Sequence, residues 1–108
     1  MLKIYMAGVG GMLGEAFYQK FNEDNILKCT DLDVNSNWLT YLDFRDFESY
    51  KKDVTKFNPD WLFHIGAFTD LEYCELHEEE TYATNTESVQ HAVSIANKLS
   101  IPILYIST

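Results

Sequence analysis

Residues 2–14 read Leu2-Lys3-Ile4-Tyr5-Met6-Ala7-Gly8-Val9-Gly10-Gly11-Met12-Leu13-Gly14, and this stretch decides the fold of the chain. Apolar side chains alternate with Lys3 and Tyr5 up to Ala7, which is the period of a β-strand. Four glycines follow, and residues 15–21 continue as a helix because Leu13, Phe17 and Phe21 recur on one face. The stretch therefore predicts a strand, a glycine turn and a helix.

A glycine turn at this place can bind phosphate. The first N–H groups of a helix are unpaired and carry a partial positive charge. Gly8 suits a sharp turn, Gly11 lets a pyrophosphate approach the backbone, and Gly14 lets the helix pack closely on the strand. Gly10 is an additional glycine in this turn. A glycine turn that binds nothing is the alternative, but the position between a strand and an amphipathic helix favours binding.

The same spacing predicts where the phosphates lie. A dinucleotide bound at this turn would place its pyrophosphate over Gly11, Met12 and Leu13. The three turn glycines follow a Gly-x-x-Gly-x-x-Gly spacing, because Leu13 stands where many dinucleotide folds have the last glycine of Gly-x-Gly-x-x-Gly.

Composition limits the classes of partner. The 108 residues suffice for one small domain, and the formal net charge is −9, with eight Lys and Arg against 17 Asp and Glu. This balance leaves too few basic residues to form a positively charged surface, so we expect no binding to nucleic acid or to an anionic membrane. No signal peptide and no bilayer-spanning apolar run are visible, and we expect a cytoplasmic protein.

The cysteines and histidines do not form a metal-binding pattern. Cys29 and Cys74 lie far apart, and we interpret them as free thiols of a reducing compartment. Cys74 and His77 form a pair without further ligands in the sequence, so we expect no metal. His64 stands inside an apolar strand and is predicted to be a hydrogen-bonded core residue. His64, His77 and His91 do not together form a metal-binding set.

Strands and helices alternate along the whole chain. After the first helix we predict strands over 26–30, 38–42, 61–67 and 101–106, and helices over 47–57, capped by Asp46 and stopped at Asn58-Pro59, and from Glu78 to Leu99. This alternation predicts an α/β doubly wound (Rossmann) parallel sheet of about five strands in the order 3-2-1-4-5, with helices on both faces. The ligand cleft is expected between the first and fourth strands. The last helix is expected to bury one stripe, which comprises Tyr82, Thr86, Val89, Val93, Ala96 and Leu99.

Asp31 is the candidate for cofactor choice. It lies 23 positions after Gly8, at the end of the second strand, where an acid can bind the ribose hydroxyls and disfavour a 2′-phosphate. The single arginine, Arg45, lies elsewhere in the sequence. We therefore expect NAD(H), with NADP(H) as the alternative, and Asp33 as the weaker candidate for the same role.

Asp43 and Phe44 follow the short third strand. An acid and a flat ring at this edge could meet the adenine of the cofactor. The alternative is an acid at the start of a helix and an aromatic residue of the core.

Further candidates stand at the ends of the last two strands. Gly66, Ala67 and Phe68 close the fourth strand, where small residues leave room for a cofactor or simply allow close packing. Ile106 ends the last strand and is included among the expected cofactor contacts. Thr108 could hydrogen-bond a substrate carbonyl, although a hydroxyl alone is uninformative.

Together these residues resemble the extended short-chain dehydrogenase/reductase superfamily, in its nucleotide-sugar branch. Residues 7–14 resemble the motif Thr-Gly-x-x-Gly-x-x-Gly, with Ala7 in place of Thr. Residues 63–75 resemble a segment of dTDP-4-dehydrorhamnose reductases, which Thr69 and Glu75 match, whereas Glu72 replaces an Asp.

The resemblance implies a reductase that transfers hydride to a 4-keto sugar nucleotide. Its catalytic set is a Ser or Thr, here Thr108, with a Tyr-x-x-x-Lys pair that does not occur in these 108 residues. We therefore expect residues 1–108 to be the NAD(P)-binding part of a larger enzyme, with the sugar-binding part further on. An epimerase or dehydratase of the same branch and a non-catalytic nucleotide-binding module are the alternatives, and a homodimer is left open.

Overall fold

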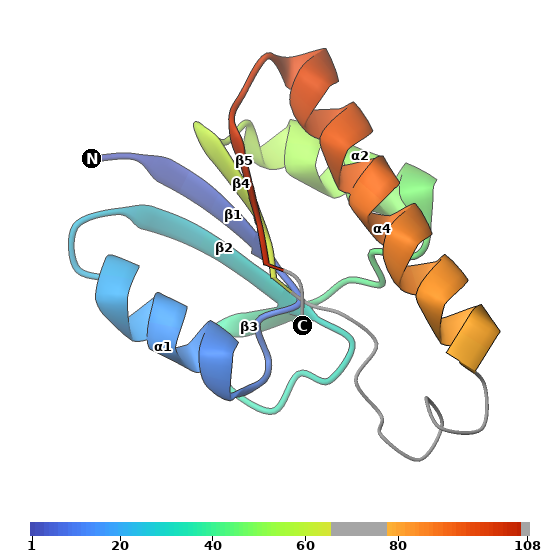
Figure 1. Cartoon of the computed structure of the whole chain (residues 1–108). Helices are drawn as coiled ribbons and strands as arrows, with labels where there is room; N and C mark the ends of the chain where they lie inside the picture. The colour runs from blue at the N-terminus through green and yellow to red at the C-terminus, as the bar shows by residue number, and fades with distance from the viewer. Residues whose placement is uncertain (66–77, 107–108) are drawn as a thin grey trace.

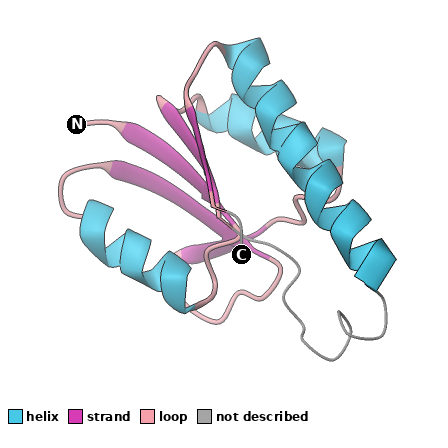
Figure 2. Ribbon diagram, viewed as in Figure 1, coloured by secondary structure: helices cyan, strands magenta, loops and turns pink. Residues whose placement is uncertain are grey.

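The described part of the chain forms one parallel sheet flanked by helices (Figures 1 and 2). The computed structural model describes residues 1–65 and 78–106. In these residues the sheet has five strands in the order β3-β2-β1-β4-β5, with every neighbouring pair parallel. The strands are β1 (Lys3–Ala7), β2 (Ile26–Asp31), β3 (Leu39–Tyr41), β4 (Trp61–His64) and β5 (Ile103–Tyr105). The predicted strand order is confirmed.

The helices cover both faces of the sheet. They are α1 (Met12–Phe21), α2 (Phe47–Phe57) and α4 (Glu78–Leu99). In Figure 1, α1 lies on one side of the sheet, and α2 and α4 lie on the other. The chain therefore winds outward in both directions from β1, and the winding reverses between β1 and β4. No helix among the described residues combines the length and the apolar character that are needed to cross a bilayer.

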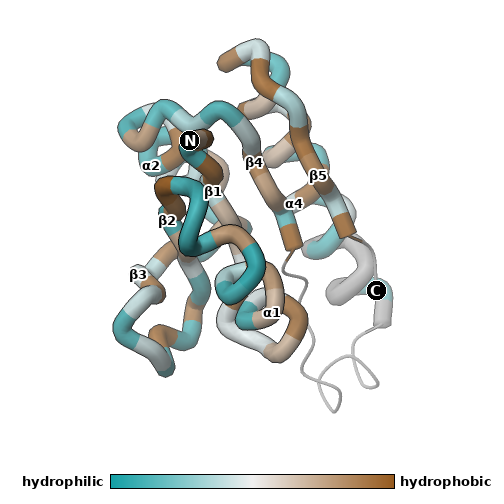
Figure 3. Tube along the Cα trace, turned by 90° about the vertical axis from the view of Figure 1, so that its left-hand side faces the viewer, coloured by the Kyte–Doolittle hydropathy of each residue, from teal (hydrophilic) through white to brown (hydrophobic). Residues whose placement is uncertain are grey.

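Each face of the sheet has its own apolar core. Figure 3 shows the apolar residues along β4 and β5 as largely brown segments. On the side of α2 and α4 the buried residues are Tyr5, Ala7, Leu42, Tyr50, Val54, Leu62, Ala92, Ile95 and Ala96. On the side of α1 they are Ile4, Met6, Val9, Cys29, Leu39, Phe63 and Ile65. Alternate residues of β1 thus serve opposite cores, as expected for a strand covered on both faces.

Helix α1 is held by its aromatic residues. Phe17 and Phe21 stack on each other with ring centroids 6.0 Å apart, and both meet the ring of Phe63 edge-on. Leu13 was expected on the same face, but its side chain is 46% exposed. It stands in the first turn of α1, at the carboxyl edge of the sheet, where the helix extends past the core. The shared apolar face therefore begins at Phe17.

The connection from β2 to β3 contains no helix in residues 32–38. Trp38 fills part of that space by stacking on Tyr18 of α1, with ring centroids 4.2 Å apart and planes 13° apart. The strand predicted from residue 38 therefore begins only at Leu39, because the Trp38 side chain is turned toward the helix.

The ends of two further strands differ from the prediction. β4 ends at His64 rather than at residue 67, although the Ile65 N–H still donates to the Ala7 carbonyl at 3.0 Å. β5 begins at Ile103 rather than at residue 101, because Pro102 has no N–H to donate. Residues 66 and 67 lie outside the described part of the chain.

Helix α4 buries the predicted stripe only in part. Thr86 is exposed, and the Val93 side chain is 39% exposed. The buried positions are Ala96, which was predicted, and Ser88, Ala92 and Ile95, which were not. Three of these four are small, and they allow α4 to pack closely on α2, β4 and β5. The prediction holds at Ala96 and at Leu99, which packs against the core, and it was wrong at Thr86 and Val93, because close approach to the neighbouring elements selects the buried positions.

Helix α2 begins and ends as predicted. Asp46 caps it, and its carboxylate accepts hydrogen bonds from the Ser49 N–H at 3.3 Å and from the Ser49 hydroxyl at 2.9 Å. Asn58 closes it in the left-handed conformation with φ of 53°, directly before Pro59. These two ends fix the segment after β3 against the sheet.

Candidate cofactor-binding site

The glycine turn joins β1 to α1 at the carboxyl edge of the sheet. Gly8 has a φ of 76°, a conformation that favours glycine. The N–H groups of Gly8 and Val9 both donate to the Thr30 carbonyl, at 2.8 and 3.1 Å. The turn is therefore tied to the end of β2, and the buried Val9 side chain anchors it in the core.

Gly14 sets the distance between α1 and the turn. A Cβ at this position would lie 2.3 Å from both Cα and the carbonyl oxygen of Val9. These are backbone atoms, which cannot rotate away as a side chain can. The close packing predicted for this glycine is confirmed, and no larger residue fits without moving the helix.

The start of α1 is open. Gly11 is the N-cap residue in an extended conformation, and no described side chain caps the helix there. A Cβ on Gly11 would meet nothing within 4 Å among the described residues beyond its two chain neighbours, and the next side chain, Met12, is 91% exposed. No described side chain therefore competes for the first N–H groups of α1, which can receive a negatively charged group.

Asp31, at the end of β2, reaches back to this turn. Its Oδ2 accepts a hydrogen bond from the Gly10 N–H at 2.8 Å, and its Oδ1 accepts one from the Asp33 N–H at 3.0 Å. Asp31 is half-buried, whereas Asp33 is exposed. The carboxylate is thus held beside the glycine turn by two backbone donors.

Gly10 is the residue whose role sequence reasoning missed. A Cβ at this position would lie 2.8 Å from Cγ of Asp31. The sequence contained a signal for this contact, because an extra glycine in the turn preceded an acid at the end of the next strand. That signal could not be interpreted without the register that pairs Ala7 with Thr30 and so brings the two ends together.

Asp43 and Phe44 lie after β3, as predicted, and each already has partners in the chain. The Arg45 guanidinium binds the Asp43 carboxylate with Nε to Oδ1 at 2.8 Å and Nη2 to Oδ2 at 2.9 Å. These hydrogen bonds hold the pKa of Asp43 below its usual value. The Phe44 ring packs on His64 with centroids 4.8 Å apart, at the edge of the core of α2 and α4.

His64 is a hydrogen-bonded core residue, as the sequence predicted. It is 1% exposed, and its Nδ1 lies 2.9 Å from the Tyr50 hydroxyl. Burial, with a smaller contribution from His91, lowers the pKa of His64 to about 4. Burial also raises the pKa of Tyr50. The pair is therefore neutral near pH 7.

Several predicted site residues lie outside the described part of the chain. These are Gly66, Ala67, Phe68 and Thr108. Cys74 and His77 also lie outside it. Ile106 is described: its N–H donates to the His64 carbonyl at 3.3 Å, and its side chain packs against the core beside α1. Among residues 1–65 and 78–106, no group of three His, Cys, Asp or Glu could hold a metal ion.

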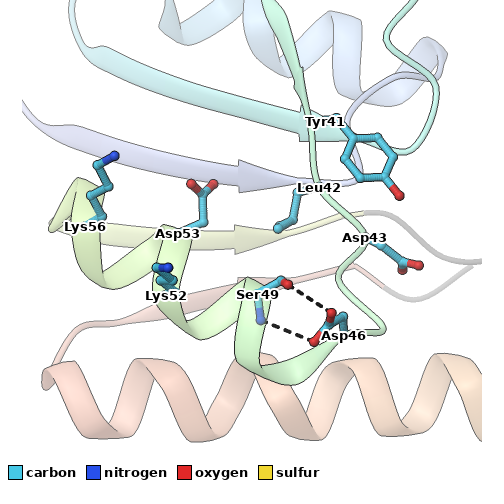
Figure 4. A pocket seen from close by; sticks show the side chains of 8 residues that line it. All are labelled: Tyr41, Leu42, Asp43, Asp46, Ser49, Lys52, Asp53 and Lys56. Carbon is cyan, nitrogen blue, oxygen red and sulfur yellow. Dashed lines mark hydrogen bonds between the residues drawn. The ribbon is translucent and has the colours of Figure 1, made fainter.

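A pocket of about 440 Å³ lies between α2 and the segment after β3 (Figure 4). Its lining residues are Tyr41, Leu42, Asp43, Asp46, Ser49, Lys52, Asp53 and Lys56. Asp53 also accepts a hydrogen bond from the buried Tyr5 hydroxyl at 2.5 Å. Neither the glycine turn nor Asp31 lines this pocket, so it is separate from the candidate cofactor site except at Asp43.

Comparison with known proteins identifies the family. The family model described as the RmlD substrate binding domain matches residues 2–108. The chain belongs to this family. A hypothetical dTDP-4-dehydrorhamnose reductase from Sulfolobus tokodaii is 26% identical with a TM-score of 0.82, and the match covers 97% of this chain and 38% of that one.

Two further solved structures have the same fold as this RmlD-family chain. A dTDP-4-dehydrorhamnose reductase from Bacillus anthracis in complex with NADP is 18% identical, with a TM-score of 0.82 over 99% of this chain and 36% of that one. An L-threonine dehydrogenase from Clostridium difficile is 19% identical, with a TM-score of 0.86 over 100% and 37%. The chain thus spans less than two fifths of the length of these enzymes.

Proposed function

We propose that this chain is the NAD(H)-binding part of an oxidoreductase that reduces a 4-keto nucleotide sugar, as dTDP-4-dehydrorhamnose reductases do. One observation carries the proposal: the open N-terminus of α1 lies beside a carboxylate that the same turn already orients. A phosphate acceptor next to a ribose acceptor is the arrangement that a dinucleotide requires. The family match over residues 2–108 supports the nucleotide-sugar branch.

Each part of the cofactor has candidate contacts in this chain. The pyrophosphate would lie over Gly11, Met12 and Leu13, and Asp31 would accept hydrogen bonds from the ribose hydroxyls. We place the adenine near Asp43 and Phe44, which follow β3 at the same edge of the sheet. The nicotinamide end would lie toward the carboxyl ends of β4 and β5, and its proposed contacts are Gly66, Ala67, Phe68 and Ile106.

The oriented carboxylate also supports NADH over NADPH. A 2′-phosphate would bring negative charge against Asp31, and the single arginine already binds Asp43. The relative from Bacillus anthracis was solved with NADP, so NADPH is the alternative cofactor. The two are distinguished directly by their affinities for this chain.

The bound cofactor would supply the hydride for a sugar ketone. In this chain Thr108 would donate a hydrogen bond to the ketone oxygen and so stabilise the negative charge that develops there. No Tyr-x-x-x-Lys pair occurs among the 108 residues. We therefore expect that the chain alone binds NADH but does not reduce the sugar, because it holds no positioned proton donor.

A fusion tests this function. Residues 1–108 would be joined to the remaining part of the reductase from Sulfolobus tokodaii. Turnover would be followed as NADH oxidation with dTDP-4-dehydrorhamnose, as NAD+ reduction with L-threonine, and as formation of the epimer with UDP-glucose and NAD+. We expect turnover with the 4-keto sugar, and none in the same fusion carrying Gly11→Val. A folded fusion that binds NADH but epimerises UDP-glucose or oxidises threonine would contradict the reductase assignment. Turnover by residues 1–108 alone would show that the catalytic residues lie within this chain, and not beyond it as we propose.

A further inference from the structure

The turn glycine Gly10 and the carboxylate of Asp31 form one unit. The Gly10 N–H donates to Oδ2 of Asp31 at 2.8 Å. A Cβ on Gly10 would lie 2.8 Å from Cγ, 3.0 Å from Oδ2 and 3.2 Å from Cβ of Asp31, and these are the three atoms nearest to it. The space that a side chain at position 10 would occupy is therefore the space that the carboxylate fills.

We propose that Gly10 is a positioning residue that determines the choice between NADH and NADPH, because it holds the Asp31 carboxylate where the ribose hydroxyls bind. The proposal rests on the function proposed above and adds a residue to it. It assigns to Gly10 a role distinct from that of Gly11, although the two glycines are neighbours in the same turn.

The hydrogen bonds explain how the carboxylate can be both fixed and available. Each carboxylate oxygen can accept two hydrogen bonds. The Gly10 N–H takes one site on Oδ2, and the Asp33 N–H takes one site on Oδ1. With respect to the described residues, one site on each oxygen is left, which matches the two hydroxyls of an unphosphorylated ribose. A charge-assisted hydrogen bond is about twice as strong as a neutral one, so this orientation matters for affinity.

The Gly10 amide is itself held in place. The two preceding N–H groups, of Gly8 and Val9, both donate to the Thr30 carbonyl. Thr30 directly precedes Asp31, so the turn and the carboxylate are tied to the same end of β2. The Asn35 side chain also donates to the Gly10 carbonyl, at 3.4 Å. The Gly10 amide and the backbone of Asp31 are therefore held at a fixed separation while the turn stays formed.

A small side chain at position 10 should displace Asp31 rather than unfold the chain. Gly10 does not have a positive φ, so alanine fits its backbone conformation. The two closest atoms, Cγ and Oδ2 of Asp31, can rotate away into solvent because this side chain is only half-buried, and the 3.2 Å contact with the Asp31 Cβ then requires only a small shift of the turn. The cost should thus appear in the position of the carboxylate.

The test is a set of fluorescence titrations with NADH and NADPH. We expect Gly10→Ala and Asp31→Asn each to reduce the preference for NADH over NADPH about tenfold, which is the scale of one hydrogen bond to a charged group. The double variant should reduce it no further, because both changes remove the same oriented carboxylate. Gly11→Ala is the matched control: it should weaken both nucleotides and leave their ratio unchanged.

Different results overturn different claims. An unchanged ratio in Gly10→Ala, or additive effects in the double variant, would overturn the role of Gly10 while the proposed function stands. A wild-type chain that binds neither nucleotide would overturn the proposed function itself. Amide NMR of Asp31→Asn tests the contact without changing position 10: the Gly10 amide proton should move upfield and the Gly11 amide should not. A Gly10 amide that does not move would overturn the proposal.

Discussion

Replacing Gly14 by alanine should destabilise the fold although alanine is the better helix former. Helix propensity favours alanine over glycine by about 1 kcal/mol. The new Cβ would lie 2.3 Å from two backbone atoms of Val9, whereas carbon atoms in contact lie about 3.5–4.0 Å apart. Helix α1 must therefore move outward by about 1 Å, which loosens the packing of Phe17 and Phe21 on Phe63.

The magnitude follows from these two opposing effects. Overpacking of a core costs about 1–3 kcal/mol, and a clash with backbone belongs at the upper end because no side chain can rotate to relieve it. After the gain in propensity, Gly14→Ala should lower the free energy of unfolding by about 2 kcal/mol. That is a large fraction of the roughly 5–15 kcal/mol that stabilises a domain.

Urea unfolding followed by circular dichroism measures this difference. Gly11→Ala is the matched control, because it makes the same chemical change three residues earlier, where a Cβ would clash with none of the residues that the structure describes. Its effect on the free energy of unfolding should stay below about 1 kcal/mol, the usual scale for a change at an N-cap. Equal midpoints and slopes for the two variants would refute the close packing of α1 on Val9.

Three further predictions follow from the polar contacts. Asp31→Asn should reduce the preference for NADH over NADPH by about 1–2 kcal/mol, measured as the ratio of dissociation constants, and an unmoved ratio would make Asp31 an ordinary loop residue. Tyr50→Phe removes the hydroxyl that is hydrogen-bonded to the buried His64 ring and should lower the free energy of unfolding by about 1–3 kcal/mol in urea; no loss would mean that the ring finds another partner. Because the pKa of His64 is about 4 in the folded chain and about 6.5 when unfolded, the unfolded state binds more protons between these values, so stability should fall as pH drops from about 6.5 to about 4. The slope from this group approaches about 1.4 kcal/mol per pH unit, and His64→Asn should lack it; identical slopes in both proteins would assign the acid sensitivity to other groups.

The periodic parts of the sequence predicted most of the fold. Alternation in β1 and the capped helix after Asp46 are local patterns, and the structure confirms them together with the strand order. Errors arose where a distant partner decides the outcome. Trp38 leaves the strand because Tyr18 of α1 offers a stacking surface. Small residues such as Ala92 lie on the buried face of α4, because they allow the neighbouring elements to approach closely.

The candidate site was predictable as a set of positions and not as a set of contacts. Gly8 and Gly14 meet local requirements of the backbone, a positive φ and a close approach, so their roles in the turn could be inferred from their spacing in the sequence. The contact between Gly10 and Asp31 spans 21 positions and depends on the register of two strands. Asp43 and Arg45 lie only two positions apart, but Asp43 was predicted as a cofactor contact and not as the partner of Arg45.

The central claim is that the open N-terminus of α1, beside Asp31, binds the pyrophosphate of NADH. Titration of residues 1–108 with NADH, followed by its fluorescence, tests this claim most directly, with Gly11→Val as the paired variant. A Cβ at Gly11 meets no atom of the described residues within 4 Å apart from its chain neighbours, so this variant should fold while its branched side chain blocks the phosphate. The account predicts saturable binding by the wild-type chain and none by Gly11→Val. Equal binding by the two proteins would contradict it.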